Sequence, residues 1–270
     1  MYIGDWSSDV CSSDLGLYTA YTGMINQEHR MDVLTNNLAN ADTNGYKKEG
    51  ATAQSFDSIL AYKIKDNSEG YRLAKRTGVH NPGVKIGEGY TDFSQGPLKT
   101  TENPYDLALT DKGFFAVEFT DKQGETSVKY TRDGNFTLNE SGELVTQDGD
   151  RVLGTNGQPV KIDPLKDTQI NVQGQIIQDG KVAATIQVTD FEDYNYLKRY
   201  GENYFEPIDG ATEKDTTAKV YAGYLETSNI SVVTEMVNMI TVSRAYETNQ
   251  KVITTYDGTL DIAANQLGKV

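Results

Sequence analysis

The carboxyl-terminal end of the chain carries an apolar repeat that is too long for the rest of the chain to bury. Between positions 232 and 267, apolar side chains recur at steps of three and four, the spacing of a coiled-coil seam. Eight of the eleven seam positions are apolar: Val232, Met236, Met239, Tyr246, Ile253, Leu260, Ala264 and Leu267. The polar exceptions are Ser243, Gln250 and Asp257. Ser231 is placed to cap the amino end of this predicted helix.

The length of this helix carries a consequence for assembly. As one helix, residues 230–267 would extend about 57 Å, whereas a β domain of about 135 residues is roughly 35–40 Å across. A second apolar stripe, at Val233, Val237 and Ile240, adds to the surplus. The surplus predicts burial against other copies of the chain, and a head-to-tail contact that does not close produces a helical filament. An intramolecular helical hairpin is the alternative.

The amino-terminal segment predicts a second amphipathic helix. Its apolar positions are Leu17, Tyr21, Met24, Met31, Leu34, Leu38 and Ala41, and its polar face carries Asn26, Arg30, Asp32, Asn36, Asn37 and Asn40. Asn44-Gly45 is a plausible stop for this helix. The amides of Asn36, Asn37 and Asn40 allow two interpretations: a solvated face, or hydrogen bonds between subunits that set the register.

Between the two helices, the spacing of turn dipeptides is typical of β-structure. Turn dipeptides at Asp133-Gly134, Ser141-Gly142, Asp148-Gly149 and Asn156-Gly157 recur every seven or eight residues, as in a β-meander. Phe114 and Phe115 should point to opposite faces of one strand. Arg132 beside Asp133 indicates hairpin stabilisation or an interface contact. Residues 46–90 indicate a mostly extended connector with one short helix around Phe56–Ile64.

These patterns predict an α+β fold, in which a mainly-β central domain, a meander or barrel-like, lies between long paired helices from the two termini. Residues 15–45 and 228–270 would form the helical inner-core assembly domain, 46–90 the connector and 91–227 the outer β domain. Residues 1–14, a Ser/Asp-rich stretch with the single Trp and the single Cys, indicate an appended or disordered segment.

Composition excludes several classes of function. A net charge of −14 argues against nucleic-acid binding and against docking on anionic lipid, and no apolar run is long enough to insert in a membrane. Two histidines, His29 and His80, offer little for catalysis or a zinc site. Asp148 and Asp150 lack the further ligands of a calcium loop. We therefore expect no enzymatic activity, no cofactor and no metal.

Three blocks of sequence carry a family resemblance. The first holds Leu17-Tyr-Thr-Ala-Tyr-Thr-Gly-Met24, Asp32-Val-Leu-Thr-Asn-Asn-Leu-Ala-Asn40 and Thr43-Asn-Gly-Tyr-Lys47. The second holds Asp106-Leu-Ala-Leu109, Gly113-Phe-Phe115, Tyr130-Thr-Arg-Asp-Gly-Asn-Phe136 and Gly142-Glu-Leu-Val145. The third holds Gly223-Tyr-Leu-Glu-Thr-Ser-Asn229, Glu235-Met-Val-Asn-Met-Ile240 and Arg244-Ala-Tyr-Glu-Thr-Asn249. In order and over residues 15–270, these blocks resemble the bacterial flagellar rod and hook proteins.

The resemblance implies a structural subunit of the rod, the hollow drive shaft that transmits torque from motor to hook through the periplasm or cell wall. Within the family the chain is most similar to the distal rod member, and the proximal rod and hook members stay open. The implied partners are further copies in a helical assembly, other rod and hook proteins, bushing rings where an outer membrane exists, and the export apparatus. Export would proceed without a cleaved signal peptide.

The predicted assembly residues combine the two helices: Leu17, Tyr21, Met24, Met31, Asn36, Asn37, Leu38, Asn40, Glu235, Met236, Met239, Ile240, Arg244, Tyr246, Asn249, Ile253 and Leu260. A different class of function remains as an alternative, a secreted β-rich protein of the cell wall that binds or hydrolyses carbohydrate.

Overall fold

The computed structural model describes residues 6–63, 75–122, 124–201, 203–262 and 265. The chain divides into two compact units. The first comprises residues 1–38, 49–90 and 232–270, and the second comprises residues 39–48 and 91–231.

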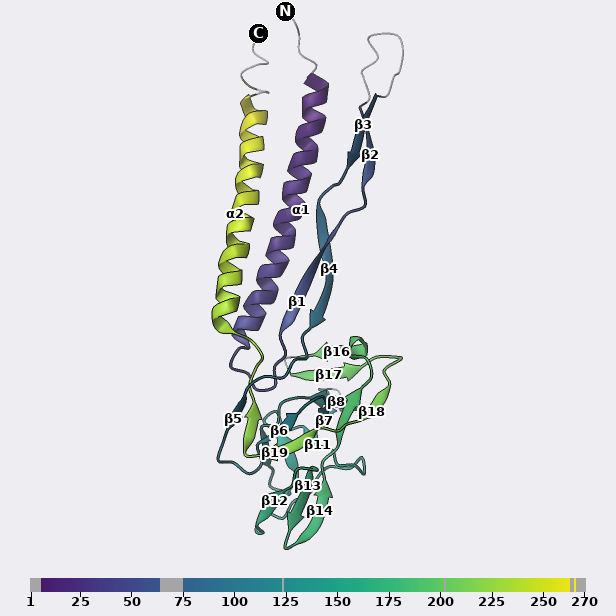
Figure 1. The fold of residues 1–270 in the computed structure, drawn as a ribbon, viewed down its shortest axis with the longest axis vertical. Coiled ribbons are helices and arrows are strands. Elements are labelled where there is room, and N and C mark those ends of the chain that lie inside the picture. The colour runs from purple at the N-terminus through teal and green to yellow at the C-terminus, as the bar shows by residue number, and fades with distance from the viewer. Residues whose placement is uncertain (1–5, 64–74, 123, 202, 263–264, 266–270) are drawn as a thin grey trace, which may run out of the picture. The chain divides into compact units, whose positions relative to one another are not determined.

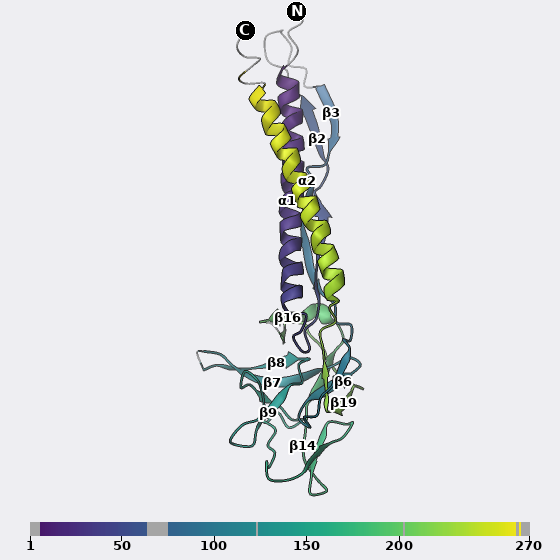
Figure 2. The same ribbon diagram turned by 90° about the vertical axis from the view of Figure 1, so that its left-hand side faces the viewer.

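The first unit combines two long helices with two strand pairs (Figure 1). Its elements are α1 (Trp6–Ala39), β1 (Glu49–Ser55), β2 (Ile59–Lys63), β3 (Lys75–His80), β4 (Val84–Thr91) and α2 (Val232–Ile262). Strand β1 pairs with β4, and β2 pairs with β3. The helices lie side by side and antiparallel in both views (Figure 2).

Two local expectations for this unit are corrected. Helix α1 ends at Ala39, five residues before the predicted Asn44-Gly45 stop, although Gly45 does adopt a left-handed φ of 68°. The short helix expected at Phe56–Ile64 is wrong for the described part of that range, where Ile59–Lys63 forms strand β2 and pairs with β3. Ile64 lies outside the described residues. The backbone of residues 6–14 continues α1 rather than being irregular; that this segment is appended stays a prediction.

Two glycines of α1 set its register against α2. A Cβ atom on Gly16 would lie 2.6 Å from Oη of Tyr256, and one on Gly23 would lie 3.0 Å from Nδ2 of Asn249. The two contacts are seven residues apart on both helices, which is the heptad spacing of an antiparallel coiled-coil pair. The predicted pairing of the terminal helices is therefore present within one chain.

The seam of α2 consists of two rows of side chains. One row agrees with the prediction, and the other is shifted by one residue toward the amino end of the helix. The row Met239, Tyr246, Ile253 and Leu260 is half-buried as expected. The other row is Glu235, Val242, Asn249 and Tyr256, which are buried or half-buried, in place of the exposed Met236, Gln250 and Asp257. The predicted Ser243 is half-buried, whereas the predicted Val232 is exposed. Close approach at the two α1 glycines makes room for the bulky polar side chains. The predicted Ala264 and Leu267 lie outside the described residues.

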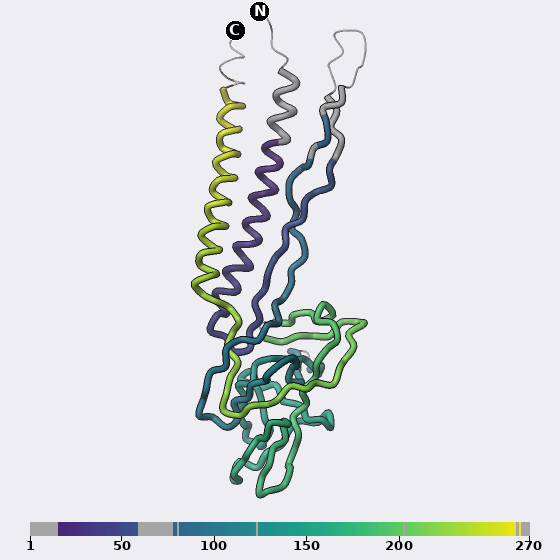
Figure 3. Tube along the Cα trace, in the orientation of Figure 1, coloured from purple at the N-terminus to yellow at the C-terminus, as the bar shows by residue number. Residues whose placement is uncertain are grey.

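A ribbon formed by β1 and β4 lies along α1 (Figure 3) and covers part of its polar face, since Asn26 and Asn37 are buried while Arg30 and Asn36 are exposed. The hydroxyl of Thr22 donates to the Pro82 carbonyl over 3.4 Å, and the side-chain amide of Asn26 donates to the Lys85 carbonyl over 3.5 Å. Gly83, at φ 119°, approaches Thr22 closely enough that a Cβ would collide with the hydroxyl. Asn26 is consequently 3% exposed, although its polar neighbours predict a solvated face.

The second unit is built mainly of short strands. They are β5 (Leu98–Thr100), β6 (Leu107–Thr110), β7 (Phe114–Thr120), β8 (Thr126–Thr131), β9 (Phe136–Leu138), β10 (Leu144–Thr146), β11 (Arg151–Val152), β12 (Thr168–Ile170), β13 (Gln175–Gln178), β14 (Lys181–Thr185), β15 (Val188–Phe191), β16 (Leu197–Tyr200), β17 (Tyr204–Pro207), β18 (Glu213–Asp215), β19 (Lys219–Ala222) and β20 (Tyr224–Glu226), with a short 3-10 helix at Tyr194–Tyr196.

The largest sheet of this unit has the order β16-β17-β8-β7-β11-β10-β9, with β15 pairing β7 and β18 pairing β15. Its β9-β10-β11 part is the predicted meander, with turns at Ser141-Gly142 and Asp148-Gly149. The described strands form open sheets, so the α+β class is confirmed and the barrel-like alternative is wrong. A three-stranded sheet β12-β13-β14 and the pairs β19-β6 and β20-β5 complete the unit.

Two apolar clusters lie on opposite faces of β7. Phe115 packs with Phe136 at 5.2 Å between ring centroids, and Phe114 packs with Phe93 and Phe205 at 5.8 and 5.5 Å. Phe114 and Phe115 are both fully buried. The predicted alternation is confirmed, and both faces of this strand are core.

Candidate assembly site

A buried ion cluster of the second unit joins the two segments that connect it to the helices. Nζ of Lys47 lies 2.5 Å from Oε1 of Glu226, and Nη1 of Arg132 lies 3.3 Å from Oε2 of the same carboxylate. All three side chains are at most 3% exposed. Burial lowers the pKa of Lys47, a trend that the charge of Glu226 opposes. One carboxylate thus holds two cations away from water.

Backbone groups complete this cluster. The Gly96 N–H donates to Oε1 of Glu226 over 2.8 Å, and Nζ of Lys47 donates to the carbonyl of Ser94 over 2.8 Å. The guanidinium of Arg199 lies 4.1 Å from the centre of the Tyr46 ring and donates to the Lys47 carbonyl. Buried charges are tolerated where geometry and further hydrogen bonds compensate for desolvation, and both conditions are met here.

The cluster holds two segments of chain side by side. The Gly45 N–H donates to the Glu226 carbonyl over 2.7 Å, and the Lys48 N–H donates to Oδ1 of Asn229 over 2.8 Å. The first segment leads from α1 to β1 and the second leads from β20 to α2. The connections of both terminal helices therefore start from one cross-linked point of the second unit.

The expected interpretation of Arg132 is corrected by this geometry. Its guanidinium bonds to Glu226, 94 residues away, and lies 5.3 Å from the centre of the Phe114 ring, instead of stabilising the hairpin at Asp133. Asp133 is half-buried beside Asn203, and partial burial raises its pKa from 3.8 to about 6, helped by the charges of Asp148 and Asp106.

The amide of Asn37 is used inside the chain. Its Nδ2 donates to the Glu49 carbonyl over 2.8 Å, and its Oδ1 accepts from the Glu49 N–H over 2.9 Å. Asn37 is completely buried. The hydrogen bond between subunits that the sequence suggested for Asn37 is therefore replaced by a bond to the start of β1.

The face of α2 that points away from its seam is apolar and exposed. Val233 is 73% exposed, Met236 48%, Val237 57% and Ile240 54%. We call these four residues the α2 stripe. Arg244, also exposed, continues the same helical face by one more turn. Such a contiguous apolar face marks an interaction surface in a protein that is otherwise strongly charged.

The predicted assembly residues divide into three groups by exposure. Half-buried are Leu17, Met24, Met31, Leu38, Met239, Tyr246, Asn249, Ile253 and Leu260; exposed are Tyr21, Asn36, Met236, Ile240 and Arg244; buried are Asn37, Asn40 and Glu235. The exposed and half-buried groups can meet a second chain, whereas the buried group supports the fold of its own chain. His29 is half-buried on α1, and His80 ends β3.

In the described residues, neither helix has a stretch apolar enough to cross a membrane. The same residues hold no group of three or more His, Cys, Asp or Glu with the geometry of a metal site.

Comparison with known proteins agrees with the three sequence blocks. Residues 17–47 match the flagella basal body rod protein family, 108–184 the D1 domain of flagellar hook protein FlgE/F/G, and 221–267 the flagellar basal body rod FlgEFG protein C-terminal family. The flagellar hook-basal body complex protein FlhO of Bacillus subtilis is 34% identical, covering 94% of this chain and 99% of the relative. The chain belongs to the flagellar basal-body rod protein family.

Two further relatives of this rod protein come from Caulobacter vibrioides. The flagellar basal-body rod protein FlgG is 33% identical over 93% of this chain and 98% of its own length, and the protein FlgF is 32% identical over 95% and 99%. The resemblance inferred from sequence is thereby confirmed. The alternative of a wall-associated carbohydrate protein is not favoured, since the matches cover both helices and the β region.

The sequence blocks contained the ion cluster but did not reveal it. Each of the three blocks contains one of the charges, Lys47, Arg132 or Glu226. In sequence, Glu226 is 179 residues from Lys47 and 94 residues from Arg132. A usable signal existed, because each charged residue follows an aromatic or apolar segment where a solvated charge would be unexpected. Which three charges meet required the fold.

Proposed function

We propose that this chain is a structural subunit of the distal rod of the bacterial flagellar basal body, which assembles through its terminal helices into a hollow, torque-transmitting shaft. The α2 stripe carries the proposal: apolar residues at i, i+4 and i+7 stay exposed after α1 has covered the seam. Burying them against further copies would stabilise a filament by about 1–2 kcal/mol per side chain.

Family membership supports this proposal, because the matches include relatives named as basal-body rod proteins. The proposed setting is the basal body within the periplasm or cell wall, reached without a cleaved signal. Other rod and hook proteins, bushing rings and the export apparatus are the proposed partners. The helical pair, 15–45 with 228–270, would form the inner core and 91–227 the outer domain.

Electron microscopy and sedimentation of concentrated protein test the proposal. We expect rods from the unchanged chain, and at least a tenfold higher assembly concentration for the double variant Val237→Ser with Ile240→Ser. The matched control replaces two exposed polar positions of the same helix, Asn238→Ser with Thr248→Ser. Equal assembly by both double variants would contradict a role of the stripe.

A further inference from the structure

A leucine of the second unit is held out into solvent by a well-bonded turn. Leu165 is 94% exposed. Its N–H donates to Oδ1 of Asp163 over 3.1 Å, and the backbone of Asp163 is bonded on both sides to the side-chain amide of Gln178. The next residue, Lys166, forms an ion pair with Asp179 over 3.0 Å. The turn is thus fixed to the β13–β14 hairpin, and it presents an apolar side chain to solvent.

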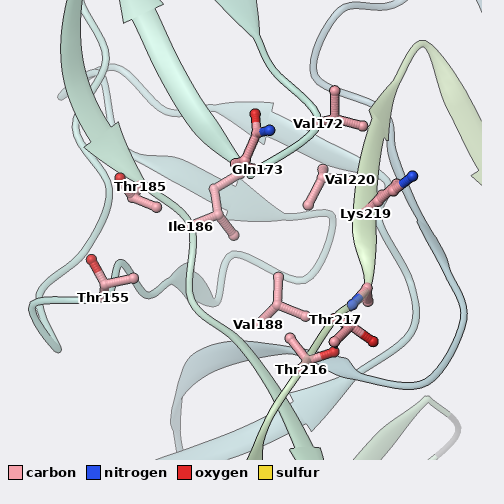
Figure 4. Close-up of a pocket in the computed structure, with 11 residues that line it drawn as sticks. Thr155, Val172, Gln173, Thr185, Ile186, Val188, Thr216, Thr217, Lys219 and Val220 are labelled. Atoms are coloured by element: carbon pink, nitrogen blue, oxygen red, sulfur yellow. Dashed lines mark hydrogen bonds between the residues drawn. The ribbon is translucent and has the colours of Figure 1, made fainter.

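A hollow of about 560 Å³, lined by five apolar and six polar residues, lies in the same unit (Figure 4). Figure 4 shows Ile186, Val188 and Val220 around one space, with hydroxyl groups at its edge from Thr155, Thr185, Thr216 and Thr217. Ile186 and Val220 are 2% and 3% exposed, so they form a firm floor. The hollow has the size and lining to take a branched aliphatic side chain.

The leucine and the hollow are at opposite ends of the three-stranded sheet β12-β13-β14. At the leucine end, Thr168 pairs with Gln178, and Gln178 pairs with Lys181. At the other end, Gln175 pairs with Thr185, beside the turn at 171–174 that borders the hollow. The seven residues from 165 to 172 span up to about 23 Å when extended. Leu165 is 94% exposed, so it does not fill the hollow of its own chain.

We propose that Leu165 of one copy inserts into the hollow beside Val188 and Val220 of the next copy. A projection and a complementary hollow on different faces of one molecule produce a head-to-tail contact, which propagates as a helix rather than closing into a dimer. The exposed Asp167 beside the projection and the exposed Lys219 at the hollow have opposite charges, which favours this pairing. The contact rests on the proposed function and adds a link between outer domains to that between helices.

Cross-linking tests the contact directly. In a Cys11→Ser background, which removes the single native thiol, Leu165→Cys and Thr217→Cys are combined and treated with a short bismaleimide. Assembled protein should give a ladder of covalent multimers, whereas the dilute chain should stay monomeric. Each single-cysteine variant can give at most dimers.

The possible outcomes separate the two proposals. Rods without a ladder would overturn the contact and leave the rod function intact, while absence of rods in the Cys11→Ser parent would count against both. As a second measurement, Leu165→Ser should raise the assembly concentration about tenfold, as expected for loss of one buried leucine. Val182→Ser, which removes another exposed aliphatic from the same sheet, should not. Equal effects of the two variants would overturn the proposal.

Discussion

Lys47 and Glu226 form an ion pair across 179 residues of sequence, with both side chains shielded from water. Because Arg132 bonds to the second oxygen of the same carboxylate, Glu226 pairs directly with two buried cations. This arrangement ties the segment after α1 to the segment before α2, so a family block from each terminus and one from the middle depend on one side chain.

Replacing Glu226 with glutamine should therefore destabilise the second unit strongly. The change removes the carboxylate that pairs directly with two buried cations, and breaking a buried ion pair costs about 3–5 kcal/mol in comparable cases. Urea unfolding followed by tyrosine fluorescence measures the loss. The control is Glu118→Gln, which removes one of two carboxylates that pair with the partly exposed Arg151 and should cost about 1 kcal/mol or less. Similar losses for both variants would show that the buried cluster has no special importance.

Asp133 should make stability depend on pH between about 4 and 6. Its pKa rises from 3.8 to about 6 on folding, so in this interval the folded chain binds more protons than the unfolded chain. Stability from this group is therefore greatest below pH 4 and falls as the pH rises through 6. The rise in pKa corresponds to on the order of 3 kcal/mol.

Asp133→Asn isolates this effect. The variant should be more stable than the unchanged chain at pH 7.5, and the difference should shrink towards pH 4, as measured by urea midpoints at several pH values. Asp209→Asn, at an exposed turn, should follow the parent at every pH. A variant less stable than the parent at pH 7.5 would mean that the ionised carboxylate is needed.

Asn37→Ala should loosen the start of β1. The variant removes both bonds between the Asn37 amide and the Glu49 backbone, at about 1 kcal/mol for each bond. Hydrogen exchange should show a faster Glu49 amide. Asn36→Ala, one residue earlier, removes a bond to Oε2 of the Glu49 side chain but leaves both backbone bonds in place, so it should change that rate little. Unchanged protection of Glu49 in Asn37→Ala would be inconsistent with the observed bonds.

Periodicity predicted the helices and half of the α2 seam, because the row from Met239 to Leu260 is apolar throughout. It could not predict the other row. Met236 is more hydrophobic than Glu235, yet Glu235 is buried and Met236 is exposed, since the position of α1 is decided by its glycines rather than by the composition of α2. A pattern within one helix carries no information about a close approach set by its partner.

The burial of polar side chains on α1 was also not predicted from the sequence. Asn26 and Asn37 lie among charged and amide residues and so predict a solvated face, but the backbone groups of the β1–β4 ribbon satisfy their amides. The sequence of the ribbon does not alternate clearly between apolar and polar residues, so residues 46–90 predicted only an extended connector. A polar helix face covered by backbone is indistinguishable, in sequence, from one covered by water.

Alanine substitutions at the glycines of α1 test the helix pairing, because close packing predicts destabilisation where an exposed glycine predicts stabilisation. Glycine to alanine in an exposed helix stabilises by about 1 kcal/mol, and Gly258→Ala on α2, with nothing within 4 Å of the added methyl, should do so. Gly16→Ala and Gly23→Ala place a methyl against Tyr256 and Asn249 and should lose that gain or destabilise. Thermal unfolding of the assembled protein, followed by helical circular dichroism, measures all three. Combining Gly16→Ala with Tyr256→Phe removes the nearest atom and should restore part of the loss, whereas a stabilising Gly16→Ala would show that the two helices are apart at this level.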